Sequence, residues 1–181
     1  MNANQRIVFV CGPDMTGKTQ IAKELAHRTG IPYFKASSEH QAFISSRQGK
    51  NELFLNQLRY ADMRVFDVLK QTGQSIILDR GYPCEWVYSG QFNRETDELM
   101  VFHEDESYAS LGAKIVVCIR SSYVGIVDDI DDKITAPVLE ELTDGYQRFL
   151  SWTKCESKLL YVDDEDLDRE VNELMEFLGE K

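Results

Sequence analysis

The chain has 181 residues, of which 43% are hydrophobic and 28% are charged, a length and composition typical of one soluble globular domain with a sizeable core. No apolar run approaches the roughly 20 residues that a membrane-spanning helix needs, and we expect no signal peptide in the polar N-terminus. The formal net charge of −11 argues against a large nucleic-acid-binding surface, because such surfaces are rich in basic residues.

The acidic residues gather in short runs along the chain. The runs are Glu104 to Glu106, Asp128-Asp129, Asp131-Asp132 and Asp163 to Asp166. Runs of like charge usually lie in solvent, so we expect each of them to be a solvated face or loop. A small phosphorylated substrate remains compatible with this charge, since its site needs only a few well-placed cations.

The four cysteines show neither a C-x-x-C pairing nor zinc-ligand spacing. Cys11 and Cys118 fall in expected buried strands, where a free cysteine behaves as a small hydrophobic residue. We therefore predict a reducing, cytoplasmic compartment. The histidines lack ligand spacing and are expected to be surface or capping residues; they are His27, His40 and His103.

Hydrophobic patterning predicts strands that alternate with helices. The expected strands cover residues 6–11, 31–35, 75–79, 113–119 and 158–162. The expected helices cover residues 18–29, 51–71, 136–153 and 167–178, with two more from about 85 and up to about 111. Gly30 is a natural C-terminal cap for the first helix, and Pro32 places the second strand at an edge or at its start.

This alternation predicts an α/β fold in which a five-stranded parallel sheet lies between helices on both faces, giving three layers. We expect one domain over residues 1–181, with the polar, acidic connection 121–134 as a short lid. Ligands of such sheets bind beyond the carboxyl ends of the strands. Gly12, Asp79 and Arg120 each follow a different strand there, which predicts one shared site.

A phosphate-binding loop follows the first strand. The eight residues fit G-x-x-x-x-G-K-[ST] and are Gly12, Pro13, Asp14, Met15, Thr16, Gly17, Lys18 and Thr19. Successive backbone N–H groups can converge on a polyphosphate only if the loop curls tightly, which the two glycines permit. Lys18 can then reach the outer phosphates, and the Thr19 hydroxyl can ligate Mg²⁺. The sequence therefore predicts binding of ATP with Mg²⁺.

A second pair of candidate residues closes the strand over 75–79. P-loop enzymes keep an acid at such a strand end to position Mg²⁺, directly or through water, and Asp79 stands there. Arg80 comes next, and its planar guanidinium is suited to gripping a phosphate with two hydrogen bonds. We therefore expect Asp79 and Arg80 to act in the same cleft as Lys18.

These motifs resemble those of the thymidylate kinase family. The resemblance is carried by the loop from Gly12 to Thr19, by Asp79-Arg80-Gly81-Tyr82 after an apolar strand, by the ungapped stretch from Leu53 to Arg80, and by Asp163 after the last strand. It implies the P-loop nucleoside triphosphate hydrolase fold of the nucleotide kinase type. It also implies a phosphotransferase of nucleotide biosynthesis, with ATP and Mg²⁺ as cofactors, a small nucleotide as substrate and a homodimer as the assembly.

The resemblance also implies the substrate residues. They are Asp14, Lys35, Phe54, Arg59, Tyr60, Arg80 and Tyr82. Arg80 and Arg59 would hold the acceptor phosphate, and Asp14 would contact the acceptor sugar hydroxyl. Phe54 or Tyr60 could stack on the base, although packing in the core also explains these aromatic residues. Lys35 would be a further cation that grips phosphate.

The chain departs from the family at one catalytic position. Family members carry an arginine in the loop after the Asp or in the lid, whereas this chain has Met15 in the loop and only Lys133 as a cation in the lid. Either Arg120, Lys133 or Arg94 substitutes, or the enzyme is slower, or its acceptor has a different geometry. We expect Arg120, at the mouth of the fourth strand, to be the replacement, so the predicted catalytic set is Lys18, Asp79, Arg80 and Arg120.

Three readings of the function follow. The first is ATP-dependent phosphoryl transfer to a (deoxy)nucleoside monophosphate, a thymidylate-like pyrimidine nucleotide or a modified one. The second is a deoxynucleoside kinase, in which Arg80 would serve ATP and Glu39 would be the nearby acid. The third is a P-loop switch protein with slow hydrolysis, or a kinase acting on bases within DNA, against which the acidic charge argues.

Overall fold

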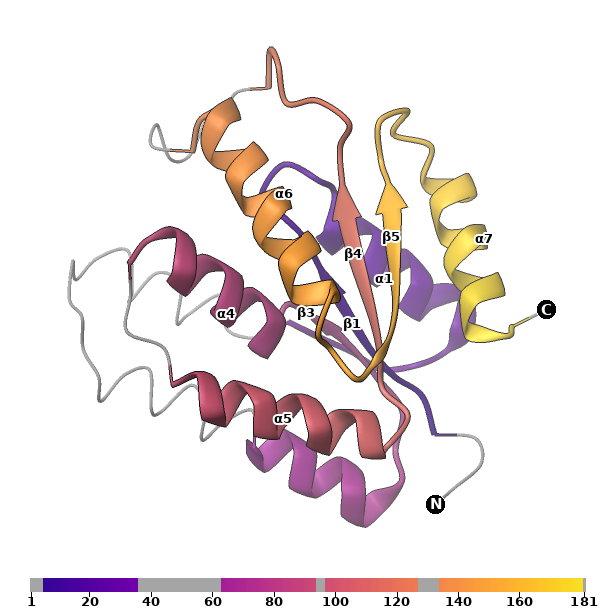
Figure 1. The fold of residues 1–181 in the computed structure, drawn as a ribbon. Coiled ribbons are helices and arrows are strands. Elements are labelled where there is room, and N and C mark those ends of the chain that lie inside the picture. The colour runs from indigo at the N-terminus through magenta and orange to yellow at the C-terminus, as the bar shows by residue number, and fades with distance from the viewer. Residues whose placement is uncertain (1–4, 36–62, 94–96, 127–133, 181) are drawn as a thin grey trace.

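The computed structural model describes residues 5–35, 63–93, 97–126 and 134–180. Five parallel strands form one sheet in the order β2-β3-β1-β4-β5 (Figure 1). The strands are β1 (Ile7–Cys11), β2 (Tyr33–Lys35), β3 (Ile76–Asp79), β4 (Lys114–Ile119) and β5 (Glu156–Tyr161). The predicted α/β fold with a five-stranded parallel sheet is confirmed. β2 is an edge strand, as the proline before it indicates.

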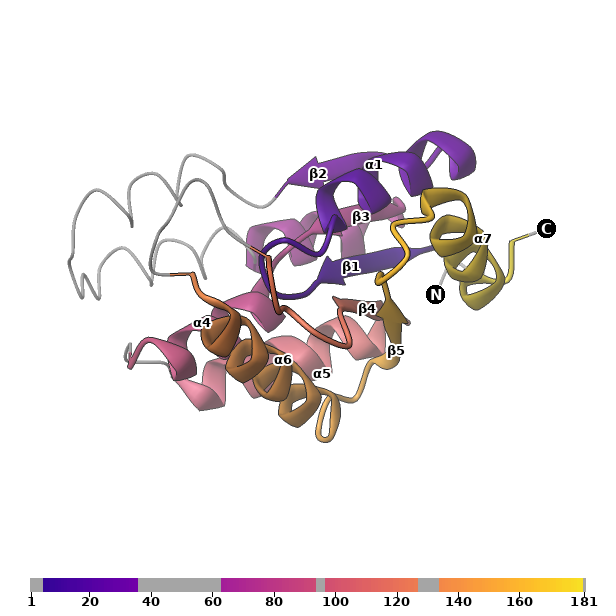
Figure 2. The ribbon, with the colours of Figure 1, turned by 90° about the horizontal axis from the view of Figure 1, so that it is seen from above.

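Helices cover both faces of this sheet, which gives the three predicted layers (Figure 2). One face carries α1 (Lys18–Thr29) and α7 (Leu167–Leu178). The other carries α4 (Tyr82–Gln91), α5 (Glu98–Ser110), α6 (Ala136–Leu150) and the helical residues 63–72. Residues 51–62 of the predicted helix 51–71 lie outside the described residues. None of the helices in the described ranges has the length and apolarity needed to cross a bilayer.

Most element boundaries agree with those expected, and α1 and α7 have the expected ends. The C-cap Gly30 has φ 68° and its N–H donates to the carbonyl of Ala26, which is the expected left-handed cap. The start of α4 differs, since this helix begins at Tyr82 rather than near Glu85. Pro83 lies in its first turn, where a missing N–H costs nothing because no intrahelical partner exists there.

The core has two halves, one on each face of the sheet. Short aliphatic residues of β1, β3 and β4 pack against α1 and α7. The opposite half is rich in aromatic rings. Phe9 of β1 meets Tyr108 and Tyr82 edge-on, with ring centroids 4.8 and 5.2 Å apart, and this geometry is favourable for aromatic pairs. Tyr82, expected to contact substrate, is 1% exposed in this half.

The acidic run on α5 is partly buried, which corrects the expectation of a solvated face. Glu104 and Asp105 are each 1% exposed. Asp105 accepts hydrogen bonds from the Tyr82 hydroxyl at 2.9 Å, the Lys154 backbone N–H at 2.7 Å and the Thr153 hydroxyl. A buried carboxylate needs such donors, and here it ties α4 and α5 to the turn before β5. The sequence gives no sign of these donors, because they lie far away along the chain.

We expect Asp105→Ala to lower the free energy of unfolding by about 3 kcal/mol, because it leaves the buried Tyr82 hydroxyl and two partly buried donors without their charged acceptor. Urea denaturation followed by circular dichroism measures this loss. Glu106→Ala is the matched control, since the ion pair between Glu106 and Lys154 is exposed at the surface and such pairs contribute less than about 1 kcal/mol. Equal stabilities of the two variants would contradict the role given to Asp105.

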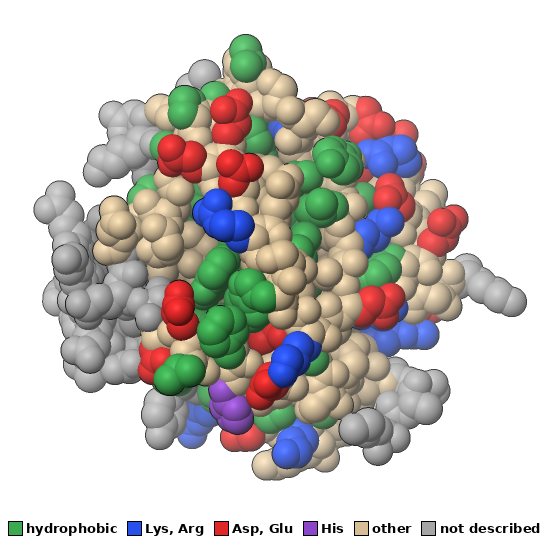
Figure 3. All heavy atoms as spheres, viewed as in Figure 1, with side chains coloured by type: hydrophobic (Ala, Val, Ile, Leu, Met, Phe, Trp, Pro, Cys, Tyr) green, Lys and Arg blue, Asp and Glu red, His purple; other side chains and the backbone are tan. Residues whose placement is uncertain are grey.

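Charged side chains of both signs are interspersed on one face of the molecule. On the face seen in Figure 3, Lys and Arg side chains lie among Asp and Glu side chains, and those drawn in colour form no continuous basic stripe.

Candidate active site

The loop between β1 and α1 is shaped by its two glycines. Gly12 has φ 141°, and a Cβ at this position would lie 2.2 Å from the carbonyl oxygen of Cys118 on β4. Gly17 has φ 66° and is the N-cap of α1. The position of Gly12 therefore requires glycine, and the left-handed conformation of Gly17 favours it. The loop curls around the N-terminus of α1, where unpaired N–H groups and the helix dipole favour an anion.

Two side chains of this loop turn inward, Thr16 and Lys18. The Thr16 hydroxyl and the Lys18 ammonium both donate to the carbonyl oxygen of Pro13 at 2.8 Å. Nζ of Lys18 also lies 3.5 Å from Oδ1 of Asp14. Lys18 is 6% exposed, and burial and the charge of Arg80 lower its pKa, while Asp14 opposes this. A buried ammonium group beside converging N–H groups is the complement of a polyphosphate chain.

Asp79 lies at the end of β3, beside the start of α1. Its Oδ2 accepts hydrogen bonds from the Thr19 hydroxyl at 2.7 Å and the Tyr33 hydroxyl at 2.9 Å. Burial, together with the hydrogen bond to Asp79, raises the pKa of Tyr33, so the phenol keeps its proton and donates. Oδ1 of Asp79 is buried and has no hydrogen-bond partner among the described residues.

These oxygens fit a magnesium ion. Mg²⁺ prefers oxygen ligands and is usually bound by one or two protein groups, substrate phosphates and water. The unpartnered Oδ1 of Asp79 and the lone pairs of the Thr19 hydroxyl supply such groups beside the phosphate loop. The described ranges contain no cluster of three or more His, Cys, Asp or Glu side chains that could hold a metal by themselves, so a cation here would need the phosphates as further ligands.

A second cationic group lies next to the first. Nη2 of Arg80 donates to Oδ1 of Asp14 at 2.6 Å, and the Tyr88 hydroxyl of α4 donates to Oδ2 at 2.8 Å. Burial alone would raise the pKa of Asp14, but the charges of Lys18 and Arg80 outweigh it and hold the pKa low. Arg80 has φ 78°, a left-handed conformation that is uncommon for non-glycine residues and often marks functional sites.

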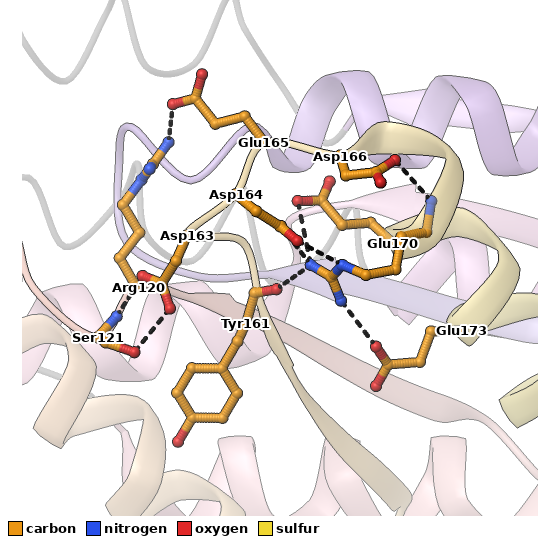
Figure 4. A network of polar contacts seen from close by, with 10 residues as sticks. Arg120, Ser121, Tyr161, Asp163, Asp164, Glu165, Asp166, Glu170 and Glu173 are labelled. Carbon is orange, nitrogen blue, oxygen red and sulfur yellow. Dashed lines mark hydrogen bonds and ion pairs between the residues drawn. The ribbon is translucent and has the colours of Figure 1, made fainter.

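Arg120 follows β4 and lies against the phosphate loop (Figure 4). Its Nε donates to the carbonyl oxygen of Met15 at 3.0 Å, and its Nη2 forms an ion pair of 2.7 Å with Glu165. The neighbouring Ser121 donates from its backbone and hydroxyl to Asp163, each at 2.7 Å. The guanidinium of Arg120 thus contacts the loop at the backbone of Met15.

The structure brings together only some of the residues expected in the site. Gly12, Asp79 and Arg120 stand at the carboxyl ends of adjacent strands as expected, since β1 lies between β3 and β4. Tyr82, which the resemblance assigns to the substrate, is buried in the core with its hydroxyl on Asp105. Lys35 is exposed and in register with Asp79. Several expected residues lie outside the described ranges, namely Glu39, Phe54, Arg59, Tyr60, Arg94 and Lys133.

Sequence reasoning missed two residues of this site, Tyr33 and Tyr88. Each donates a hydrogen bond to an acid of the site, Asp79 and Asp14 respectively. Tyr33 belongs to the edge strand and Tyr88 to the middle of α4, so neither stands in a motif. Only the period-two alternation of β2, which puts Tyr33 on the same face as Asp79, could have indicated one of them.

Comparison with known proteins gives matches among solved structures. No protein-family model and no curated protein matches the chain. The YorR protein from Bacillus subtilis, crystallised with phosphorylated GDP, has a TM-score of 0.73 at 17% identity, over 97% of this chain and 96% of that one.

Two enzymes are also similar. Thymidylate kinase from Ehrlichia chaffeensis has a TM-score of 0.68 at 14% identity, over 96% of this chain and 98% of that one. Deoxyadenosine kinase from M. mycoides has a TM-score of 0.60 at 17% identity, over 97% and 99%. These likenesses cover almost the whole length of each chain. The chain therefore has the fold of thymidylate kinase, deoxyadenosine kinase and related P-loop kinases.

Proposed function

We propose that the protein is a nucleotide kinase that transfers the γ-phosphoryl group of ATP to a (deoxy)nucleoside monophosphate, of the thymidylate-like pyrimidine type. One observation carries the proposal. The carboxylate of Asp14 lies 3.5 Å from the Lys18 ammonium and 2.6 Å from the Arg80 guanidinium. Two cations, one from the start of α1 and one from the turn after β3, therefore meet at one acid. A donor phosphate and an acceptor phosphate bound side by side would require this arrangement.

The ligands bound in two of the similar structures support this proposal. Deoxyadenosine kinase from M. mycoides was solved with the products dCMP and dCDP, and YorR with phosphorylated GDP. These ligands are nucleotides bound to proteins with the same fold. They support a nucleotide substrate, whereas the pyrimidine base rests on the resemblance of the motifs.

In the proposed reaction, the protein positions the reactants and stabilises charge, as phosphoryl transfer requires. The loop N–H groups and Lys18 bind the phosphates of ATP. Arg80 holds the acceptor phosphate, and Asp14 accepts a hydrogen bond from the acceptor sugar. Mg²⁺, held by Thr19 and Asp79, would neutralise charge on the phosphate oxygens. We also propose that residues 121–134 act as the lid that excludes water.

The assembly and the cellular compartment of the protein remain predictions. A homodimer rests on the family resemblance. A reducing, cytoplasmic compartment rests on the cysteines, all four of which are buried free thiols.

ATP consumption with a panel of acceptors tests the proposal. We expect stimulation by nucleoside monophosphates, strongest with pyrimidine deoxynucleotides, and none by nucleosides or duplex DNA. Stimulation by nucleosides alone would select the deoxynucleoside kinase instead, and stimulation by duplex DNA would select a kinase of bases in DNA. If no acceptor stimulates the slow consumption of ATP, a P-loop switch is the better description.

A further inference from the structure

The edge strand β2 places one aromatic residue beside the catalytic acid. In its pairing with β3, Tyr33 lies opposite Ile77 and Lys35 opposite Asp79. Side chains alternate between the faces of a strand, so Tyr33 and Asp79 share the face that α1 covers. The ring of Tyr33 packs against the core on this face, and Nζ of Lys23 on α1 lies 5.9 Å from its centroid. Figure 2 shows β2 and β3 beside α1.

Asp79 is held by one of its two oxygens. Oδ2 accepts hydrogen bonds from the Tyr33 phenol at 2.9 Å and the Thr19 hydroxyl at 2.7 Å, while Oδ1 is buried without a partner among the described residues. Two donors that converge on one oxygen from different elements, β2 and α1, fix the rotation of the carboxylate. That rotation leaves Oδ1 available as an acceptor.

We propose that Tyr33 is a positioning residue for the divalent cation, acting through Asp79. This inference rests on the proposed function. Thr19 both donates to Asp79 and, through the lone pairs of its hydroxyl, is a predicted ligand of the cation. Tyr33 is not a predicted ligand of the cation. Its phenol therefore donates to Oδ2 continuously, which leaves Oδ1 available to the cation or to a water molecule bound to it. Outer-shell partners of this kind typically change metal affinity about 10- to 100-fold.

Tyr33→Phe isolates the effect, because it removes the hydroxyl and keeps the ring against α1. Mn²⁺ is the probe, and its binding is followed by electron paramagnetic resonance in the presence of a non-hydrolysable ATP analogue. We expect Mn²⁺ to bind about 10-fold more weakly in Tyr33→Phe. Calorimetry without the metal should give an affinity for the analogue within about twofold of the wild type. A thermal melt establishes that the variant is folded.

Tyr161→Phe is the matched control, since Tyr161 is a strand residue on β5 that is 50% exposed. It should bind Mn²⁺ as the wild type does. Unchanged Mn²⁺ affinity in Tyr33→Phe would overturn the inference, and so would an equal loss of affinity for the analogue without metal, because that loss indicates a distorted loop. If the wild type binds neither the analogue nor Mn²⁺, the proposed function itself fails, which is a different outcome.

Discussion

Lys18→Ala is expected to lower turnover by at least about 10³-fold, because it removes the ammonium group that meets the developing charge on the phosphates in a site shielded from water. The variant should remain folded. Lys18 is the first residue of α1, where alanine is a favourable residue, and its ammonium group contacts Pro13 and Asp14 of the loop. Turnover measured with saturating ATP and the best acceptor tests this expectation, with a thermal melt as the measure of folding.

Lys154→Ala is the control for loss of a lysine, because its ammonium forms an exposed ion pair with Glu106, away from the loop. It should retain turnover within about twofold of the wild type. A folded Lys18→Ala variant with turnover near that of the wild type would refute the assignment of the loop as the binding site for the transferred phosphate.

Arg120→Ala should have the second large effect. A cation at the transferring phosphoryl group contributes about 10³–10⁵-fold in rate, and Arg120 is the guanidinium that the structure places on the loop at the carbonyl of Met15. We expect turnover to fall by about 10³-fold, with a much smaller change in the affinity for a non-hydrolysable ATP analogue. Stopped-flow turnover and calorimetry measure the two quantities separately.

Two variants of the same network serve as controls. Arg169→Ala removes an arginine that binds Asp164 and the carbonyl of Tyr161 but not the loop. Glu165→Gln removes the carboxylate that pairs with Arg120. Both should keep turnover within about fivefold of the wild type. If Arg120→Ala does the same, the replacement cation is another residue, and Lys133 and Arg94 become the variants to measure.

The fold was predictable because its signals are local. Each strand of the sheet interior is a short apolar run, and α1 and α7 have clear starts and ends, such as the left-handed Gly30. The loop could be predicted for the same reason, since its glycines, Lys18 and Thr19 stand at fixed spacing in eight consecutive residues. The start of α4 was misplaced because Pro83 reads as a turn, although proline is also accepted in a first helical turn.

The polar contacts between distant elements were not predictable. Asp105 belongs to an acidic run that looks solvated, yet donors from α4 and the turn before β5 make its burial favourable. Tyr82 belongs to a recognised motif, but the same contact directs its ring into the core. Tyr33 reaches Asp79 across 46 positions of the chain. Such pairs depend on which strands become neighbours, and a linear pattern does not contain that information.

The packing of Gly12 on the backbone of β4 has a consequence for synthesis on the ribosome. β1 emerges first, but it pairs with β3 and β4, and at about 5–20 residues per second β4 follows it by roughly 5 to 20 seconds. Until β4 emerges, the apolar β1 lacks at least one of its two neighbouring strands. A nascent chain that ends before Cys118 lacks the β4 backbone against which Gly12 packs. Premature termination there would yield fragments that do not bind a nucleotide.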